Sequence, residues 1–352
     1  MPAPAALVTG IGMVTAVGLT AAETAASVRS GIMRFEESSV LDRRHRPITL
    51  AEAPEDGLPG LADALAGAGL TGRERRMVRL ASLALAECLA ALPAGQAPPP
   101  AFVSLPEMET SRPLDDARFL DALAVQLPGA FDAGRSSAAF RGRAGGLQAI
   151  DAATALVAGG APFAVCGGVD TFLDLFVLEK LDVARRVRSA VNLDGFIPGE
   201  GAAFLLVSRP EDAARVGVAP LAALSRAAFG FEEGHLLSEQ PYRGDGLAGV
   251  VAQLLDATGS DAPVRRVYSS MNGESHWAKE WGVALLRNRK GFVEDVEVVH
   301  PADCFGDAGA ASGPILAGLA ALDLRDGSTP GPCLVYASSD AGPRAALRLA
   351  RV

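Results

Sequence analysis

Two short segments in the C-terminal third of the sequence bring acids, imidazoles and a thiol close together. "HPADCFGDAG" contributes His300, Asp303, Cys304 and Asp307, and "MNGESHW" contributes Asn272, Glu274 and His276. One interpretation is a Cys-His-Asp hydrolase in which Cys304 is the nucleophile. The other is that Cys304 is a small buried hydrophobe and its polar neighbours satisfy the loop backbone. We favour the second interpretation and keep the first as an alternative.

The same residues also allow a metal site. Asp303, Asp307, Glu274 and His276 carry the right donor atoms, but their spacing matches no established ligand pattern. We therefore expect neither a metal nor a cofactor.

The elements that must position these residues alternate between strand and helix. The apolar run in 5–18 predicts a strand and a Gly-rich turn, and Thr20 can cap the helix that follows. A clear amphipathic helix is expected over 73–92, then a strand over 101–105. A helix over 146–160 precedes a strand over 163–170. Residues 43–60 are rich in Pro and charge and predict a surface loop.

The order of elements after residue 216 is similar to the order before it. Helices are expected over 247–257 and 312–324, with strands over 265–271 and 332–338. The sequence therefore predicts two similar halves, 1–215 and 216–352, with residues 43–60 inserted in the first.

Composition excludes several classes of function. The chain has 352 residues, 49% of them hydrophobic, and a formal net charge of -9, so it can bury a large core but has no basic surface for nucleic acid. Its four cysteines form no CxxC pair, which favours reduced thiols and a cytoplasmic location. No segment reaches the length of a membrane span.

Four segments carry a resemblance to β-ketoacyl synthases of the thiolase fold over nearly the whole chain. They are "VTGIGMVTAVG", "GGLQAIDAATALVAGGAPFAVCGGVDTF", "NLDGFIPGEGAAFLLV" and "GDAGAASGPILAGLAAL". Each alone is a weak Gly-rich string, but their order and spacing together are specific. The resemblance implies an α/β protein of thiolase-like fold, with two similar βαβαβ-type halves in a layered α/β/α/β/α arrangement.

The resemblance also implies that the family's catalytic residues are lost. Such enzymes resemble one another in using a Cys at a helix N-terminus, two His and a Lys. The corresponding positions fall on Arg143 for the Cys, Asn272 and Asp303 for the two His, and Val298 for the Lys. A guanidinium cannot attack a thioester, because it has no free lone pair at neutral pH. We therefore expect a degenerate site without catalytic residues.

The residues now at these positions define a candidate pocket. It comprises Arg143, Asn272, Glu274, His276, His300, Asp303, Cys304 and Ser339, the last in the "SSDAGP" segment that replaces the family's Gly-rich turn. A buried unpaired Arg would cost several kcal/mol, so Arg143 should pair with a carboxylate, with Asp303 the first candidate. Glu200 resembles a family Glu of structural role.

Further segments, such as "MNGESHWAKEWGVALLR" and "YASSDAGPRAAL", resemble segments of shortened ketosynthase-like accessory proteins of bacterial type VI secretion clusters. This resemblance implies a non-catalytic adaptor that binds a secretion effector, chaperone or spike protein. One alternative is a subunit similar to a chain-length factor, which pairs with an active ketosynthase and an acyl carrier protein. The other is an acyltransferase or hydrolase with Cys304 as a relocated nucleophile.

We also expect a homodimer. Ketosynthase-like folds resemble one another in pairing strands across a two-fold axis. The strand expected over 163–170 is apolar enough to be buried at such an edge.

Overall fold

The computed structural model describes residues 6–107, 113–258 and 262–352. Before residue 216, the large sheet contains β1 (Ala6–Thr15), β4 (Ala101–Leu105), β5 (Ser137–Phe140), β6 (Phe163–Thr171) and β7 (Glu200–Ser208). After residue 216, it contains β8 (Ala222–Leu224), β9 (Ala228–Phe231), β10 (Val264–Ser269), β11 (Phe292–Val299), β12 (Cys333–Ser338) and β13 (Pro343–Ala350). They are hydrogen-bonded in the order β11-β10-β12-β13-β8-β1-β7-β6-β4-β5, and β9 pairs with β13.

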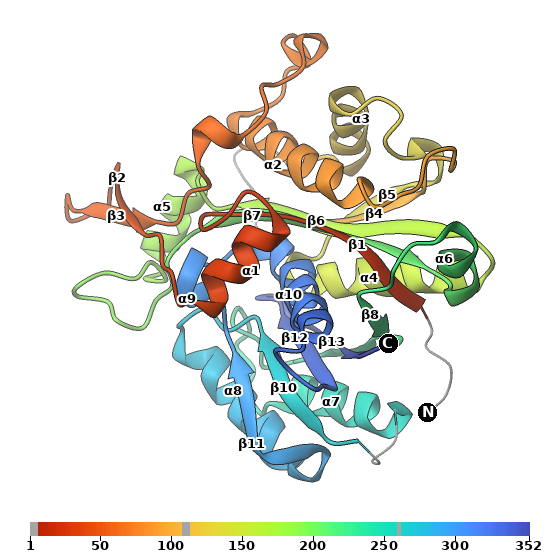
Figure 1. The fold of residues 1–352 in the computed structure, drawn as a ribbon. Helices are drawn as coiled ribbons and strands as arrows, with labels where there is room; N and C mark the ends of the chain where they lie inside the picture. Colours follow the sequence, from red (N-terminus) through yellow and green to blue (C-terminus); the bar gives the residue numbers. More distant parts are fainter. Residues whose placement is uncertain (1–5, 108–112, 259–261) are drawn as a thin grey trace.

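Helices cover these strands in layers (Figure 1). The helices α2 (Gly72–Leu89) and α3 (Asp116–Gln126) pack on the outer side of the N-terminal strands. In the middle, α4 (Gly142–Ala158) and α10 (Ser312–Asp326) contact both groups of strands. On the other side, α7 (Asp245–Thr258) packs on β9 and β13, and α8 (Ser275–Arg287) packs beside α7. This is the α/β/α/β/α arrangement that the sequence predicts.

The central position of the strands and middle helices explains their composition. Every residue of β1, β6 and β7 is buried, because helices cover both faces, and these strands are therefore mostly apolar on both faces rather than alternating. In α10 all residues from Gly313 to Leu324 are buried for the same reason. By contrast, α2 is amphipathic and begins with a capping box between Thr71 and Glu74.

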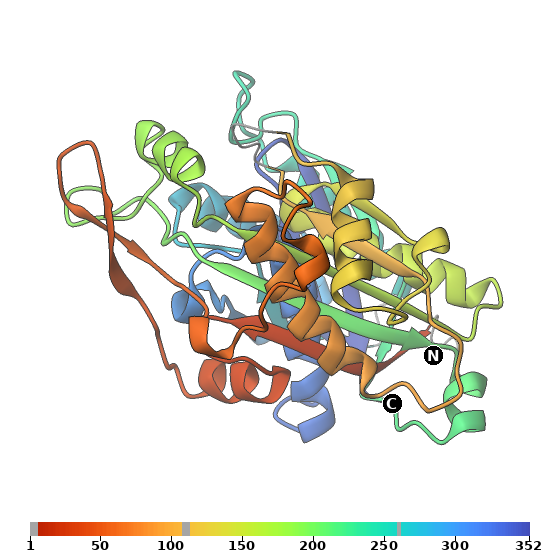
Figure 2. The ribbon, with the colours of Figure 1, turned by 90° about the horizontal axis from the view of Figure 1, so that it is seen from above.

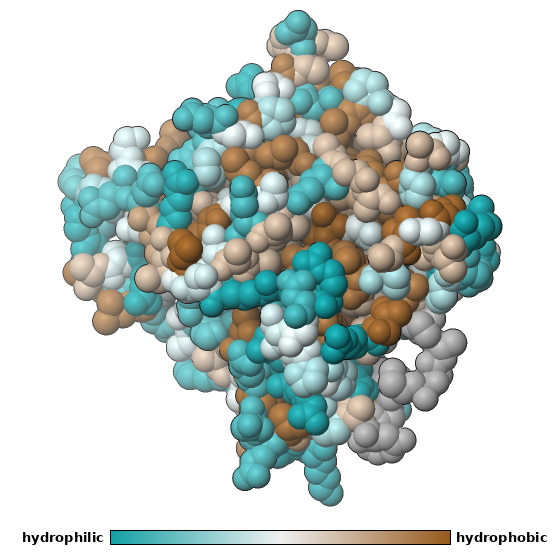
Figure 3. Space-filling view, in the orientation of Figure 1, coloured by the Kyte–Doolittle hydropathy of each residue, from teal (hydrophilic) through white to brown (hydrophobic). Residues whose placement is uncertain are grey.

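The remaining short elements lie around this core. They are α1 (Ala21–Arg29), which Thr20 caps as expected, α5 (Leu175–Val183), α6 (Pro210–Val216), α9 (Ala302–Phe305), and the strands β2 (Glu36–Leu41) and β3 (Pro47–Leu50). The face in Figure 3 mixes hydrophobic and hydrophilic side chains, as protein surfaces normally do. None of the helices in the described ranges is long and apolar enough to cross a membrane.

Two expectations about local structure were wrong. Residues 43–60 do not form only a loop, because β3 pairs with β2 in a hairpin that projects beside α5 (Figure 2), and Ile48 and Leu50 pack against Leu178. The strand β6 is not an edge strand, because it pairs with β7 on one side and β4 on the other. The ends of the sheet path are β5 and β11. The division into halves 1–215 and 216–352 remains a prediction.

Candidate functional site

The site is built around the N-terminus of α4, directly after the edge strand β5. Gly142, the first residue of the helix, has a φ of +59°, a conformation that glycine adopts at low cost. This turn directs Arg143 into the protein, where it is only 4% exposed. The position that resembles that of a family nucleophile is therefore occupied by a buried cation.

Arg143 is neutralised by two carboxylates from the C-terminal half. Its Nε donates to both Asp307 carboxylate oxygens at 3.1 and 3.0 Å, and its Nη2 also contacts Asp307. Its Nη1 donates to Asp340 Oδ1 at 2.7 Å. The expected carboxylate pairing is thus present, but Asp303 as its partner was wrong. Asp303 lies at the surface, with a side chain 63% exposed.

A second buried arginine extends the cluster. Arg186 donates through Nε and Nη2 to the two oxygens of Glu274, both at 2.8 Å, and through Nη1 to Asp340 Oδ2 at 2.6 Å. Asp340 therefore bridges the two guanidinium groups. We call Arg143, Arg186, Glu274, Asp307 and Asp340 the buried charge cluster.

Neutral groups complete the cluster. The Asn272 side-chain amide donates to Asp307 at 2.7 Å and to Glu274 at 3.1 Å. The indole of Trp277 donates to Glu274 at 3.0 Å, and its ring lies 5.5 Å from the guanidinium carbon of Arg143. Because these contacts occupy the carboxylate oxygens, none of the three acids is poised as a general base.

The electrostatics follow from burial and from this pairing. Burial alone would raise the pKa of Asp340, but the guanidinium groups of Arg143 and Arg186 lower it well below its usual range. Burial raises the pKa of the nearby Glu107, which accepts hydrogen bonds from the backbone N–H groups of Asp340 and Ala341. The carboxylates of this region therefore serve as partners for buried cations and backbone donors.

Ser339 closes the helix N-terminus. Its Oγ accepts a hydrogen bond from the Ala144 N–H at 3.0 Å and donates to the Arg141 carbonyl at 2.7 Å. Backbone N–H groups at a helix N-terminus can stabilise an oxyanion when they are free. Here the Ala144 N–H already donates to the Ser339 hydroxyl, so this donor is not free to bind an oxyanion.

Other residues of the candidate pocket lie apart from the cluster. Val298 stands on β11 and packs against the hydrophobic core beneath α7. His300 pairs with Asp303 at the surface, Nε2 to Oδ2 at 3.2 Å. Cys304 belongs to the buried core, and burial followed by the charge of Asp303 raises its pKa. No imidazole among the described residues hydrogen-bonds to this thiol, which supports its interpretation as a buried hydrophobe.

His276 lies beside the cluster rather than within it. Its ring packs between Tyr242 and Trp277, with ring centroids 4.9 and 4.8 Å apart. Burial, followed by the positive charge of Arg344, lowers its pKa. It is therefore a neutral aromatic neighbour of Trp277.

The sequence does not predict Arg186, Asp340 and Trp277 as members of the site. Asp340 stood in the "SSDAGP" segment that replaces a family turn, so its position could have suggested a role. Arg186 lies among several arginines with nothing to distinguish it. Asp307 was considered, but only as a partner for Cys304 or a metal.

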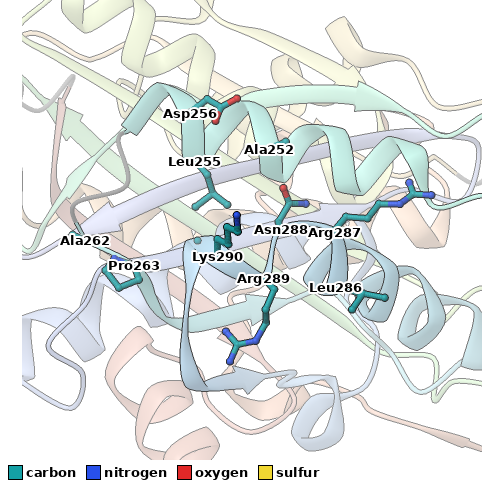
Figure 4. A pocket seen from close by; sticks show the side chains of 11 residues that line it. Ala252, Leu255, Asp256, Ala262, Pro263, Leu286, Arg287, Asn288, Arg289 and Lys290 are labelled. Atoms are coloured by element: carbon teal, nitrogen blue, oxygen red, sulfur yellow. The ribbon is translucent and has the colours of Figure 1, made fainter.

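The structure also has a surface groove and a small cavity beside Asp307. A groove of about 730 Å³ between α7 and the end of α8 is lined by Leu255, Leu286 and three cations (Figure 4). Two of these cations, Arg287 and Arg289, already hydrogen-bond to backbone carbonyls. A cavity of only about 10 Å³ adjoins Asp307. The described residues include no group of three or more His, Cys, Asp or Glu that could hold a metal.

Comparison with known proteins agrees with this architecture. The family model "Beta-ketoacyl synthase, N-terminal domain" matches residues 142–213, a segment that begins at the turn before Arg143. No curated protein sequence matches the chain significantly.

Solved ketosynthase structures match the whole chain. One is the ishigamide ketosynthase/chain length factor, with 16% identity and a TM-score of 0.79, covering 99% of both chains. Another is a type II polyketide synthase acyl-carrier protein in complex with its ketosynthase bound to the hexaketide. It has 15% identity and a TM-score of 0.78 and covers 100% of both chains. The oxazolomycin ketosynthase domain of Streptomyces albus has 14% identity and a TM-score of 0.79, covering 99% of this chain and 74% of that one. The chain thus has the mixed α/β ketosynthase, or thiolase-like, fold over its whole length.

Proposed function

We propose that this protein is a non-catalytic ketosynthase-like subunit that pairs with a catalytically competent ketosynthase, in the manner of a chain-length factor. The observation that carries the proposal is Arg143, buried at the N-terminus of α4 and paired with Asp307 and Asp340. A thiolate is needed at this position for acyl transfer by the family mechanism. The cluster fills the position with ion pairs instead.

The four thiols support a non-catalytic role. All are buried, and burial raises the pKa of each, that of Cys333 to about 12. A reactive cysteine needs the opposite, a lowered pKa and some exposure. Cys304 therefore has neither the thiolate nor the base that a relocated active site requires.

The comparisons favour a polyketide or fatty-acid context over secretion. Two of the matched structures are a ketosynthase/chain length factor and a ketosynthase with its acyl-carrier protein. By analogy, a ketosynthase and an acyl carrier protein are the expected partners, in the cytoplasm. The adaptor role in a type VI secretion cluster stays a prediction on the sequence resemblance alone.

The edge strand β5 supports pairing with another subunit. Within the part of the chain that the structure describes, β4 is the strand that pairs with it; most of its residues are exposed, and it leads directly into the turn before Arg143. An exposed edge offers unpaired backbone groups to a partner strand. We propose that β5, rather than β6, is the strand that a partner covers, whether in a homodimer or with a ketosynthase.

The experiment is copurification of the tagged full-length chain, expressed at its native level in its own host. We expect a stoichiometric ketosynthase that retains its Cys and both His. Recovery of a spike or chaperone protein in place of a ketosynthase would overturn the proposal and support the adaptor role. The neighbouring genes provide an independent check: an acyl carrier protein and an active ketosynthase would support pairing.

A further inference from the structure

The loop between β9 and α7, residues 232–244, covers the aromatic side of the buried charge cluster. The Tyr242 ring lies tilted against the His276 ring, which in turn meets Trp277 edge to face. His235 Nδ1 lies 3.1 Å from the carbonyl oxygen of Asp340, a member of the cluster. The loop thus contacts both an aromatic neighbour of the cluster and its bridging acid.

The body of the loop is largely exposed. The side chains over 236–241 are exposed or half-buried, and Leu237 is 66% exposed. At its ends, the Glu232 N–H donates to the Gly342 carbonyl, and Arg287 donates to the carbonyls of Arg243 and Gly244. A segment with few buried apolar contacts opens at low free-energy cost compared with the core. The Tyr242 contact with His276 is therefore an important part of its attachment.

Among the described residues, three buried polar atoms where the loop meets α8 and β13 have no hydrogen-bond partner. They are Tyr242 Oη, His276 Nε2 and Arg344 Nη2, from the loop, α8 and β13. A neutral imidazole tolerates this arrangement, but a protonated one would present an additional N–H without an acceptor. The closed loop therefore has no partner for the Nε2 proton of an imidazolium.

The charges around His276 come from every element that packs on it. Arg344 of β13 opposes protonation, while Glu274 before α8, Asp340 and Glu232 favour it more weakly. Tyr242 on the loop adds a neutral ring. Burial and the positive charge of Arg344 together outweigh the three carboxylates, so the pKa of His276 is lowered in the closed form.

We propose that residues 232–244 form a lid over Trp277 that closes on neutral His276 and is released when His276 is protonated. The inference does not depend on the proposed function. Because the closed form lowers the pKa and the open form restores its ordinary value near 6.5, the lid is most stable above about pH 6.5. Its stability falls as the pH drops below that value.

The test is hydrogen exchange of the full-length protein, followed by mass spectrometry and corrected for the intrinsic effect of pH. Between about pH 6.5 and about pH 5.5, the opening constant of peptides from 232–244 should rise by up to about fivefold, because opening binds at most one proton and the open imidazole is already half protonated at its ordinary pKa near 6.5. Peptides from α10 should keep their protection, which excludes global unfolding.

Variants assign the effect to one imidazole. His276→Gln should abolish the pH response, whereas His235→Gln should weaken the lid but keep it. Tyr242→Leu, which removes the covering ring, should raise lid exchange at every pH and flatten its pH dependence. Equal corrected exchange of the wild-type lid at about pH 5.5 and about pH 7.5 would overturn the proposal. So would a pH response that survives in His276→Gln or disappears in His235→Gln.

Discussion

Replacing Arg143 by Met tests how strongly the buried charge cluster is coupled. The substitution keeps an unbranched side chain of similar length but removes every ion pair that Arg143 makes to Asp307 and Asp340. Asp340 keeps Arg186 as a partner, whereas Asp307 keeps only the Asn272 amide and the Gly309 N–H. Asp307 therefore becomes a buried carboxylate without a cation.

The expected cost is about 3–5 kcal/mol of the free energy of unfolding, because breaking a buried pair leaves an uncompensated charge. The assay is urea unfolding followed by circular dichroism. The control is Arg34→Ala, which breaks an exposed pair with Glu36 and should cost about 0–1 kcal/mol. Adding Asp307→Asn to Arg143→Met should restore at least about 1 kcal/mol, because the two sites are in direct contact. A cost for Arg143→Met no greater than that of the control, or strict additivity in the double variant, would refute the reasoning.

Three further outcomes are expected. Asp340→Asn should lower stability by a constant amount above about pH 5, and the difference should shrink below about pH 4. The pKa of Asp340 is depressed in the folded protein, so below about pH 4 the wild type loses the stability that its ionised carboxylate provides. A stability difference between the two proteins that stays independent of pH down to about pH 3 would contradict this expectation. Iodoacetamide at neutral pH should label no cysteine rapidly in the folded protein and all four after denaturation, and one fast-labelled thiol would contradict the buried assignment. Light scattering at micromolar concentration should give the mass of a dimer, and a monomeric mass would contradict the homodimer.

Much of the fold was predictable because its strands and helices have strong local signals. The buried run of β6, the amphipathic pattern of α2 and the Thr20 cap all indicated the elements that form there. Strand neighbours were harder to predict, because burial alone does not tell an internal strand from a covered edge. The β2–β3 hairpin was missed because its short strands alternate weakly and carry many charges.

The sequence predicts that Arg143 pairs with a carboxylate, but it does not predict which residues form the cluster. A buried Arg143 required a carboxylate on physical grounds, and a carboxylate is there. Which acid faces inward depends on the turn after α9, which buries Asp307 and leaves Asp303 at the surface. Arg186 reaches the cluster from a distant loop, a contact that spacing in the sequence does not encode.

The most direct test of the central claim is intact-mass analysis of the full-length protein after incubation with acyl-thioester donors. A cluster of ion pairs at the N-terminus of α4, with four buried thiols of raised pKa, predicts no covalent acyl adduct on the wild type. The Arg143→Cys variant should likewise fail to condense acyl and malonyl thioesters, because one restored group does not rebuild a site whose residues act together. A stoichiometric acyl adduct on Cys304 or any other residue of the wild type would contradict the account and identify an acyltransferase.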